Sequence, residues 1–354
     1  MRNLPVGDLD HVLAATDQLW DALRGARLFI TGGTGFFGCW LLESLLWADA
    51  RHSLNVEVVL LTRSPEGFHQ KAPHLAAHRL VQLHQGDIRD FVYPNGDFSH
   101  VIHAATEASA TLNAETPRVM FDTIFEGTKR VLDFARRSGA GRFLLTSSGA
   151  VYGRQPSEMT HVAEDYPGGP DPTETHSAYG EGKRAAEFLA TLAHHEHGLG
   201  SVIARCFAFV GPHLPLDLHF AIGNFIRDGL AGRPVRVGGD GTPYRSYQYA
   251  ADLVVWLWTI LLRGVPCRPY NVGSEESLSI AEIAQKVAEF FGTGWTIAYP
   301  PTPGRPHARY VPSTARATTE LGLRSPIAFD QALVRTVEWH RSPGLMTSFP
   351  NRSE

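Results

Sequence analysis

The chain has 354 residues, of which 43% are hydrophobic and 19% are charged, and its formal net charge at pH 7 is −4. This composition is typical of a globular protein and excludes a disordered or fibrous chain. The slightly acidic balance also argues against a nucleic acid as partner, because such proteins carry a basic surface.

The first 26 residues are predicted to form a short helical extension. Asp8, Asp10, Asp17 and Asp21 are interspersed among apolar residues, so the segment has no long apolar core. It therefore fits neither a signal peptide nor a membrane span. We expect an amphipathic helix over residues 1–26, before the first strand.

Six short apolar runs follow, and segments with helical periodicity separate them. The runs cover residues 28–30, 56–61, 80–83, 101–103, 142–146 and 201–204. Strands that alternate with helices form βαβ units around a parallel sheet. The sequence therefore predicts an α/β fold with a Rossmann-like doubly wound parallel sheet, and residues 27–210 are the expected NAD(P)-binding domain.

Glycine and proline become frequent after residue 210, which predicts a smaller C-terminal substrate-binding lobe. We expect residues 211–342 to form mainly this lobe, with elements near 250–275 returning to the first domain, and residues 343–354 to form a tail. The apolar stretch around 253–262 is too short to cross a bilayer, so we predict a buried helix and no membrane role.

A glycine-rich turn comes directly after the first predicted strand. Its sequence is TGGTGFFG (31–38), and apolar residues at helical spacing follow. Gly32 allows a tight turn, Gly35 lets the backbone approach a pyrophosphate, and Gly38 permits close contact between helix and strand. In this context the turn predicts a dinucleotide site. Its predicted contacts are Gly32, Thr34, Gly35, Phe36, Phe37 and Gly38.

The end of the second strand bears on which dinucleotide binds. In such folds an acid there selects NAD, whereas an arginine accommodates the 2′-phosphate of NADP. Here the strand ends Thr62-Arg63-Ser64, without an acid. We therefore expect NAD or NADP as the cofactor, with Arg63 slightly favouring NADP. A solvated loop arginine is the alternative interpretation.

Tyr179 and Lys183 stand four residues apart, so on a helix their side chains share one face. A free tyrosine titrates near pH ~10, and moving its pKa to the neutral range requires roughly 3 to 4 kcal/mol. A nearby ammonium in a partly dry site can supply that energy, so Tyr179 is the predicted acid/base. The fifth strand runs into Thr146-Ser147-Ser148, which places hydroxyl groups at the carboxyl edge of the sheet, and we expect Ser148 to bind the same substrate oxygen.

With these features the chain resembles the extended short-chain dehydrogenase/reductases, and within them the nucleotide-sugar epimerase/dehydratase family. The resemblance spans nearly everything after residue 26 and rests on the order and spacing of eight motifs. They are TGGTGFFG (31–38), GDI (86–88), HAAT (103–106), SSGAVYG (147–153), YGEGK (179–183), RCFAFVGP (205–212), RSYQYAAD (245–252) and YNVGS (270–274).

The resemblance implies roles for single residues at the cofactor. Tyr179 is the implied acid/base, and Lys183 is implied to orient the nicotinamide ribose and to lower the pKa of that tyrosine. Asp87 and Ile88 match residues that flank adenine. The residues that match the cofactor-side edge of the fourth strand are Ala104, Ala105 and Thr106.

On the substrate side, the resemblance implies that Ser148 bonds the reacting hydroxyl of a nucleotide-diphosphate sugar. Arg245 stands where family members hold the diphosphate, and Arg309 and Asn224 are further implied contacts. A surface salt bridge is the alternative interpretation of each arginine. The two glycines of YGEGK are expected to let their helix approach cofactor and substrate closely.

Two positions next to Ser148 depart from the family pattern. The 4,6-dehydratases have an Asp-Glu pair there and the decarboxylases have a glutamate at the second place, whereas this chain has Gly149 and Ala150. Neither residue can move a proton. The sequence therefore predicts an epimerase or oxidoreductase rather than a dehydratase, unless another segment supplies the acid. The conceivable substitutes are His103, Glu107 and His176.

Other interpretations stay open because Ala208 and Ile124 replace asparagines that the family pattern contains. They are a 4,6-dehydratase with atypical acid/base residues, a small-ketone reductase and a non-catalytic dinucleotide-binding regulator. A small-ketone reductase predicts no effect of Arg245→Ala. A regulator predicts dinucleotide binding without turnover of any sugar nucleotide.

The cysteines indicate the cellular compartment, and the histidines raise the question of a metal site. Cys39, Cys206 and Cys267 are odd in number and widely spaced, which favours a reducing cytoplasm over a disulfide framework. Residues 194–197 read His-His-Glu-His but lack matching ligands at an established spacing, so we expect no metal site.

The resemblance also implies a homodimer, because family members commonly pair through helices equivalent to those expected within 107–137 and 180–197.

Overall fold

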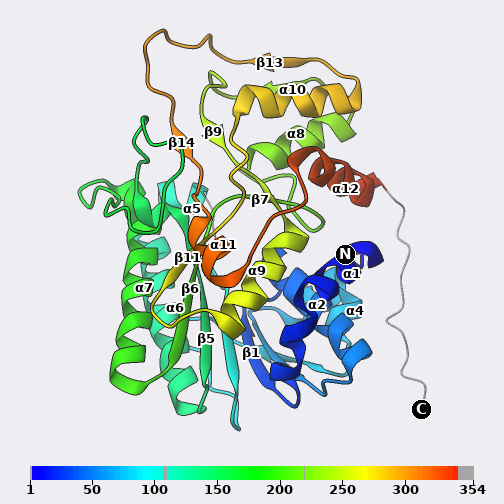
Figure 1. The fold of residues 1–354 in the computed structure, drawn as a ribbon, viewed down its shortest axis with the longest axis vertical. Helices are drawn as coiled ribbons and strands as arrows, with labels where there is room; N and C mark the ends of the chain where they lie inside the picture. Colours follow the sequence, from blue (N-terminus) through cyan, green and yellow to red (C-terminus); the bar gives the residue numbers. More distant parts are fainter. Residues whose placement is uncertain (1, 107–109, 219, 342–354) are drawn as a thin grey trace.

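A computed structural model describes residues 2–106, 110–218 and 220–341 (Figure 1). Its centre is a seven-stranded sheet in the order β11-β6-β5-β4-β1-β2-β3, and every neighbouring pair is parallel. The strands are β1 (Arg27–Thr31), β2 (Glu57–Thr62), β3 (Val81–Gln85), β4 (His100–His103), β5 (Arg142–Ser148), β6 (Gly200–Cys206) and β11 (Pro269–Val272). The predicted doubly wound parallel sheet is confirmed.

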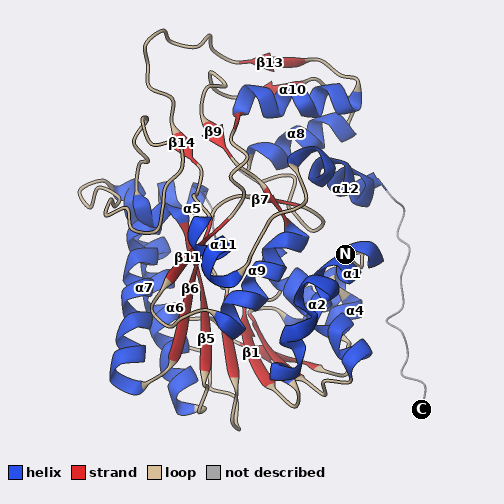
Figure 2. Ribbon diagram, viewed as in Figure 1, coloured by secondary structure: helices blue, strands red, loops and turns tan. Residues whose placement is uncertain are grey.

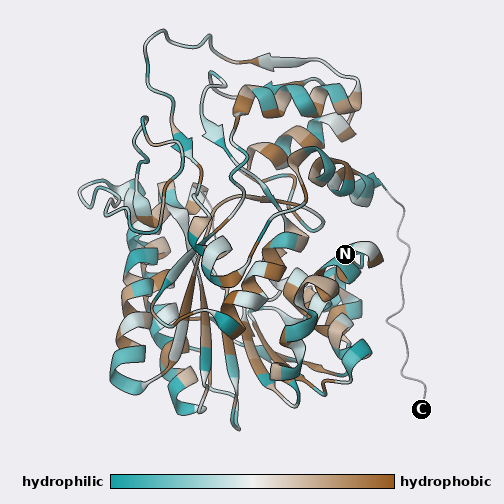
Figure 3. Cartoon of the chain, viewed as in Figure 1, coloured by the Kyte–Doolittle hydropathy of each residue, from teal (hydrophilic) through white to brown (hydrophobic). Residues whose placement is uncertain are grey.

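Helices cover both faces of this sheet (Figure 1). On one face lie α2 (Phe36–His52) and α9 (Ala250–Arg263), and on the other lie α6 (Pro117–Arg137) and α7 (Ala178–His197). Along β1, Leu28 and Ile30 pack in the core on the first face, and Phe29 packs in the core on the second. The strands are therefore apolar on both sides, as Figure 3 shows by their brown colour.

The N-terminal segment forms α1 (Val6–Thr16) and a 3-10 helix, η1 (Asp17–Leu23), which pack on α2 and α9. This is the expected helical extension, but Asp8 is buried instead of lying on a polar face. Its carboxylate accepts hydrogen bonds from Tyr249 Oη at 2.5 Å and from Arg335 Nη1 at 2.8 Å. Two partners from the C-terminal half thus compensate the buried carboxylate.

The C-terminal half builds a second lobe above the carboxyl ends of the strands (Figure 2). Its helices are α8 (Ala221–Leu230), α10 (Ile280–Phe291) and α12 (Phe329–Arg341), and its short strands are β8 (Val235–Val237), β9 (Tyr244–Arg245), β12 (Leu278–Ser279), β13 (Trp295–Ile297) and β14 (Arg309–Tyr310). Within residues 250–275, α9 is buried against the sheet and β11 pairs with β6. The predicted tail, 343–354, lies outside the described residues.

The remaining elements are short connections. They are α3 (Pro65–Lys71), α4 (Pro73–Ala76), α5 (Ala110–Glu115), η2 (Gly149–Tyr152), η3 (Thr175–Ser177), β7 (Phe209–Val210), β10 (Gln248–Tyr249) and α11 (Ala315–Leu321). Within the described ranges, no helix is long and apolar enough to cross a membrane.

Candidate active site

Ser148, Tyr179 and Lys183 come together at the carboxyl edge of the sheet. Ser148 is the last residue of β5, and the other two lie in the first turns of α7. Lys183 Nζ donates to the carbonyl oxygen of Thr146 at 2.8 Å, which fixes α7 against the end of β5. Lys183 Nζ also donates to Thr106 Oγ1 at 2.7 Å, so the predicted catalytic lysine contacts a residue predicted to line the cofactor.

The pKa of Tyr179 is raised to about 12, because burial of the side chain disfavours the phenolate more than the Ser148 hydroxyl favours it. Lys183 Nζ lies 5.9 Å from the centre of the Tyr179 ring and is bonded to Thr106 and Thr146 instead. The expected lowering of this pKa by Lys183 is therefore wrong for the protein without ligands. Desolvation outweighs a charge at that distance.

We predict that Tyr179 ionises near pH 12 in the ligand-free protein, well above a free tyrosine. Because burial penalises the phenolate, the side chain keeps its proton through pH 10. The measurement is the ultraviolet absorbance of phenolate during alkaline titration of the protein and of Tyr179→Phe. A difference between the two curves that is centred below pH 10 would contradict the prediction.

The pKa of Lys183 is shifted as well. Burial lowers the pKa of Lys183 to about 8, and the nearby Glu187 opposes the shift. Glu187 is held by a bidentate contact with Arg205, at 2.7 Å between Oε2 and Nη2, and by Ser147 Oγ at 2.5 Å. Sequence reasoning missed this network, although Glu187 stands four residues after Lys183 and Arg205 lies in the RCFAFVGP motif.

The glycine-rich turn folds as the predicted phosphate loop would require. Gly32 has a φ of +72°, and a Cβ there would lie 2.5 Å from the carbonyl carbon of Ala104. A Cβ on Gly38 would lie 2.1 Å from Cα of Gly33, so the start of α2 touches the turn directly. Gly35 is the N-cap of α2 and offers no side-chain hydrogen bond, which leaves first-turn N–H groups for an anion.

The other predicted residues of this loop lie around that helix start. The carbonyl of Thr34 accepts a hydrogen bond from Lys71 Nζ at 2.7 Å. Phe36 and Phe37 open α2, and the ring of Phe37 meets the ring of Phe209 edge-on at 5.1 Å. Their contact with a dinucleotide stays a prediction.

A cluster of charged residues marks the predicted adenosine end, beyond β2 and β3. Asp87 Oδ1 accepts from Arg89 Nε at 2.7 Å, and this bond together with the charge of Arg63 lowers the pKa of Asp87. The charge of Arg63 thus acts on Asp87, and Ile88 next to Asp87 is buried, while their contact with adenosine stays a prediction. Arg89 was not selected from the sequence, although it directly follows the GDI motif.

None of the proposed substitute acids that the structure describes is suited to replace the missing carboxylates. His103 is buried with Nδ1 at 2.8 Å from Thr31 Oγ1 and Nε2 at 3.1 Å from Thr128 Oγ1, and burial lowers its pKa to about 3. Both ring nitrogens are therefore engaged in the core. The side chain of His176 is 75% exposed and pairs with Glu174. Glu107 lies outside the described residues.

The residues after Ser148 are constrained sterically. A Cβ on Gly149 would lie 2.7 Å from the ring of Phe207, so position 149 has no room for a side chain. A Cβ on Gly180 would lie 2.8 Å from the carbonyl oxygen of Ala150, and one on Gly182 would lie 3.1 Å from Ile124. The glycines of YGEGK therefore let α7 approach neighbouring protein segments, and their expected role in close contact with cofactor and substrate stays a prediction.

The predicted substrate arginines lie on adjacent short strands. β14 pairs with β9 in parallel, so that Arg309 lies opposite Tyr244 and Tyr310 lies opposite Arg245. The guanidinium of Arg309 lies 4.3 Å from the centre of the Tyr244 ring, and that of Arg245 lies 5.9 Å from the Tyr310 ring. Asn224 lies in α8, and its role stays a prediction.

Tyr310 is a further residue of this site that the sequence does not single out. Its hydroxyl oxygen lies 3.3 Å from Ser148 Oγ, and its ring packs at 4.7 Å from the ring of Phe207. Because 162 residues separate it from Ser148, no spacing motif links the two. The pairing of β14 with β9 and the bridge between Arg309 and Gln155 bring it here.

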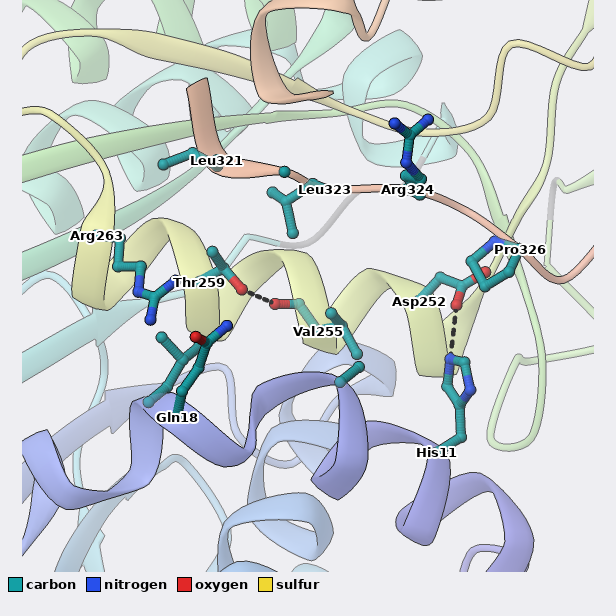
Figure 4. A pocket seen from close by; sticks show the side chains of 13 residues that line it. His11, Gln18, Asp252, Val255, Thr259, Arg263, Leu321, Leu323, Arg324 and Pro326 are labelled. Carbon is teal, nitrogen blue, oxygen red and sulfur yellow. Dashed lines mark hydrogen bonds and ion pairs between the residues drawn. The ribbon is translucent and has the colours of Figure 1, made fainter. Parts of the chain in front are cut away.

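A separate cavity of about 230 Å³ lies between α1, η1, α9 and residues 321–326 (Figure 4). Asp252 on its wall accepts from His11 Nε2 at 2.9 Å. Ser148, Tyr179 and Lys183 do not line it. The cavity is therefore distinct from the candidate active site.

Comparison with known proteins supports the same family. UDP-glucuronic acid decarboxylase 1 of Arabidopsis thaliana is 32% identical over 317 residues, which are 89% of this chain and 70% of that protein. UDP-glucuronic acid decarboxylase 1 of Xenopus tropicalis is 29% identical over 89% of this chain and 72% of its own.

Solved structures show the same fold. DesIV of Streptomyces venezuelae, a dTDP-glucose 4,6-dehydratase solved with NAD and TYD bound, matches with a TM-score of 0.77 and 25% identity, over 89% of this chain and 97% of that one. UDP-glucose 4-epimerase of Thermotoga maritima matches with a TM-score of 0.74 and 21% identity, over 89% and 98%. The model of the NAD dependent epimerase/dehydratase family matches residues 28–273. The chain thus belongs to the NAD-dependent epimerase/dehydratase family.

Proposed function

We propose that this protein is an NAD(P)-dependent nucleotide-sugar epimerase, which oxidises one sugar hydroxyl to a ketone and then reduces the ketone. The observation that carries the proposal is the meeting of Ser148, Tyr179 and Lys183 at one sheet edge, next to positions 149 and 150 that hold no acid. Hydride transfer needs the first three groups, whereas elimination of water needs an additional acid or base.

The substrate proposed is a nucleoside-diphosphate sugar. Arg245 is paired with Tyr310 and shares its face of the ladder, and its guanidinium suits a diphosphate because it binds the oxygens through charged hydrogen bonds. Arg309 is paired with Tyr244 on the opposite face, so Arg245 carries this part of the proposal. The names of the relatives point to the same class, since they act on UDP-glucuronic acid or, in DesIV, on dTDP-glucose. We therefore propose a pyrimidine nucleotide, UDP or dTDP.

The residues present fit a dinucleotide. The turn at Gly32–Gly38 leaves first-turn N–H groups at the start of α2, and Lys183 has one donor beyond the two bonds it makes. A bound NAD(P) supplies a hydride acceptor and donor at the sugar carbon. Arg63, next to Asp87, keeps NADP as the slightly favoured form.

Tyr179, Ser148 and Lys183 have different roles in the proposed proton transfer. To take the proton of the sugar hydroxyl during oxidation, Tyr179 must first lose its own proton to solvent. The phenol formed in this way returns the proton to the sugar oxygen during reduction. Ser148 donates a hydrogen bond to the same oxygen and stabilises the charge that develops on it. Lys183 holds the ribose and keeps its positive charge near the phenol, because its bonds to Thr106 and Thr146 fix Nζ at this edge.

A second candidate is oxidative decarboxylation of UDP-glucuronic acid, which the relatives at about one-third identity favour. Oxidation of the hydroxyl next to the carbon that bears the carboxylate would give a β-keto acid, and such acids lose CO₂ readily. This activity would therefore not depend on a glutamate at position 150. It uses the same three residues for the first step.

The test is to incubate the purified protein with UDP-glucose, UDP-glucuronic acid and dTDP-glucose and to follow the sugars by NMR. We expect inversion at one carbon without net consumption of cofactor, and about one NAD(P) per chain identified by mass spectrometry after denaturation. Release of CO₂ would favour the decarboxylase. A 4-keto-6-deoxy product would show a dehydratase, and exchange of cofactor at every turnover would show a reductase.

We further propose a homodimer that forms through α6 and α7, in the cytoplasm. Several apolar residues of α6, including Ile124, Val131 and Leu132, are buried in the core of the chain and therefore give no support for an interface. Phe188 on α7 is 64% exposed, and Phe121 and Phe125 stack beside each other on α6 at 5.9 Å. One exposed aromatic side chain on α7 and a half-buried aromatic pair on α6 support an interface there.

A further inference from the structure

Tyr310 lies next to Ser148 at the carboxyl edge of the sheet, although it belongs to a distant part of the chain. It is the last residue of β14, and the pairing of this strand with β9 fixes its backbone opposite Arg245. Its ring rests on Phe207, and its hydroxyl oxygen lies 3.3 Å from Ser148 Oγ and 3.5 Å from the carbonyl oxygen of Cys206. Phe207, Ser148 and the strand pairing together determine where this phenol points.

The hydrogen bonds around Ser148 can be counted. A serine hydroxyl has one proton to donate and two lone pairs that accept. The backbone N–H of Ala150 already donates to Ser148 Oγ at 3.1 Å. The single proton of the Tyr310 hydroxyl has two acceptors within reach, Ser148 Oγ at 3.3 Å and, more distant, the carbonyl oxygen of Cys206 at 3.5 Å. When Tyr310 donates to the second lone pair of Ser148, the serine can only donate its own proton, and that proton must point toward Tyr179 and the substrate oxygen.

We propose that Tyr310 is a positioning residue that forces Ser148 to act as a hydrogen-bond donor to the reacting oxygen. The inference rests on the proposed function and deepens it, because it names a fourth group of the same site. The 3.3 Å separation is longer than an ordinary O–H···O bond, as is common for catalytic hydrogen bonds before substrate binds.

The protonation of Tyr310 agrees with this role. Burial raises the pKa of Tyr310 above its ordinary range, and the neighbouring Tyr179 and Cys206 act in the same direction, while Ser148 and Arg245 oppose them. The phenol therefore keeps its proton at neutral pH and remains a donor. It does not compete with Tyr179 for the substrate proton.

The first experiment is Tyr310→Phe, which keeps the ring on Phe207 and removes only the hydroxyl. Without that donor the Ser148 proton can rotate away from the substrate. We expect kcat to fall about tenfold, as for loss of one hydrogen bond, with KM changed by less than about twofold. Tyr247→Phe is the matched control, since it removes the hydroxyl of another buried tyrosine and should leave both constants unchanged.

The second readout needs no substrate or cofactor. Because the Ser148 hydroxyl lowers the pKa of Tyr179, a misdirected serine proton should move the ionisation of Tyr179 to higher pH in Tyr310→Phe. This is measured by phenolate absorbance, as the part of the titration that Tyr179→Phe removes. Absence of turnover on every sugar nucleotide would sink the proposed function, but it would leave this titration as an independent test.

Combining Tyr310→Phe with Ser148→Ala tests whether Tyr310 acts through Ser148 or only contributes to packing. In Ser148→Ala the hydroxyl that Tyr310 acts on is missing, so adding Tyr310→Phe should lower kcat no further. Independent, additive losses would overturn the proposal, and so would an unchanged Tyr179 titration in Tyr310→Phe. If Tyr310→Phe does not fold, Ser148→Ala alone decides the matter. Loss of the shared hydroxyl must then shift the ionisation of two tyrosines, and a shift of only one would overturn the proposal.

Discussion

Tyr179→Phe is expected to lower turnover of the nucleotide sugar about a thousandfold while dinucleotide binding is retained. A positioned acid/base contributes on the order of 10² to 10⁴ in rate, and its loss leaves the rest of the site in place. Phenylalanine keeps the ring that packs against the second-face core, and Asn113 Oδ1 still accepts from the backbone N–H of residue 179 at 3.0 Å. The measurement is kcat together with dinucleotide affinity from fluorescence titration.

Tyr93→Phe serves as the matched control for this variant. Tyr93 packs against the same core, and its hydroxyl donates to Asp133 Oδ2 at 2.9 Å, on a residue outside the candidate site. This change should leave turnover within about twofold of the unmodified protein, as surface-side hydrogen bonds are worth little. Full turnover in Tyr179→Phe would instead show that another group moves the proton.

The fold could be predicted because its signals are local. The six apolar runs correspond to β1–β6, and the glycine turn sits between β1 and α2 as expected. The boundaries differ where tertiary contacts extend a strand. β5 runs on to Ser148 because it pairs with β6 through Cys206, two residues beyond the apolar run.

The site was predicted less completely, because parts of it depend on contacts that no local spacing encodes. Tyr310 reaches Ser148 through long-range contacts, which are the pairing of β14 with β9 and the bridge between Arg309 and Gln155. The pKa of Tyr179 follows from burial, which the pair spacing does not reveal. His103 could be suspected as an acid from its type, and only its two threonine partners show that it is structural.

The effect of Gly38→Ala on the free energy of unfolding also depends on a tertiary contact. Its expected sign is opposite to the one that helix propensity alone predicts. Gly38 lies inside α2, where exchange of glycine for alanine normally stabilises a helix by up to about 1 kcal/mol. A Cβ here would lie 2.1 Å from Cα and 2.3 Å from the carbonyl carbon of Gly33, and backbone cannot move aside as a side chain can. The clash exceeds the propensity gain, so the net effect should be destabilising.

We therefore predict that Gly38→Ala lowers the free energy of unfolding by roughly 3 kcal/mol, as severe overpacking does, and weakens dinucleotide binding because the phosphate turn is displaced. Gly7→Ala is the matched control, since Gly7 lies in α1 with no atom within 4 Å of the added Cβ. That change should stabilise the protein slightly and leave binding unaltered. Urea unfolding and dinucleotide titration of both variants check this. Equal effects at the two positions would mean that helix propensity decides at Gly38 and that the start of α2 can move away from the turn.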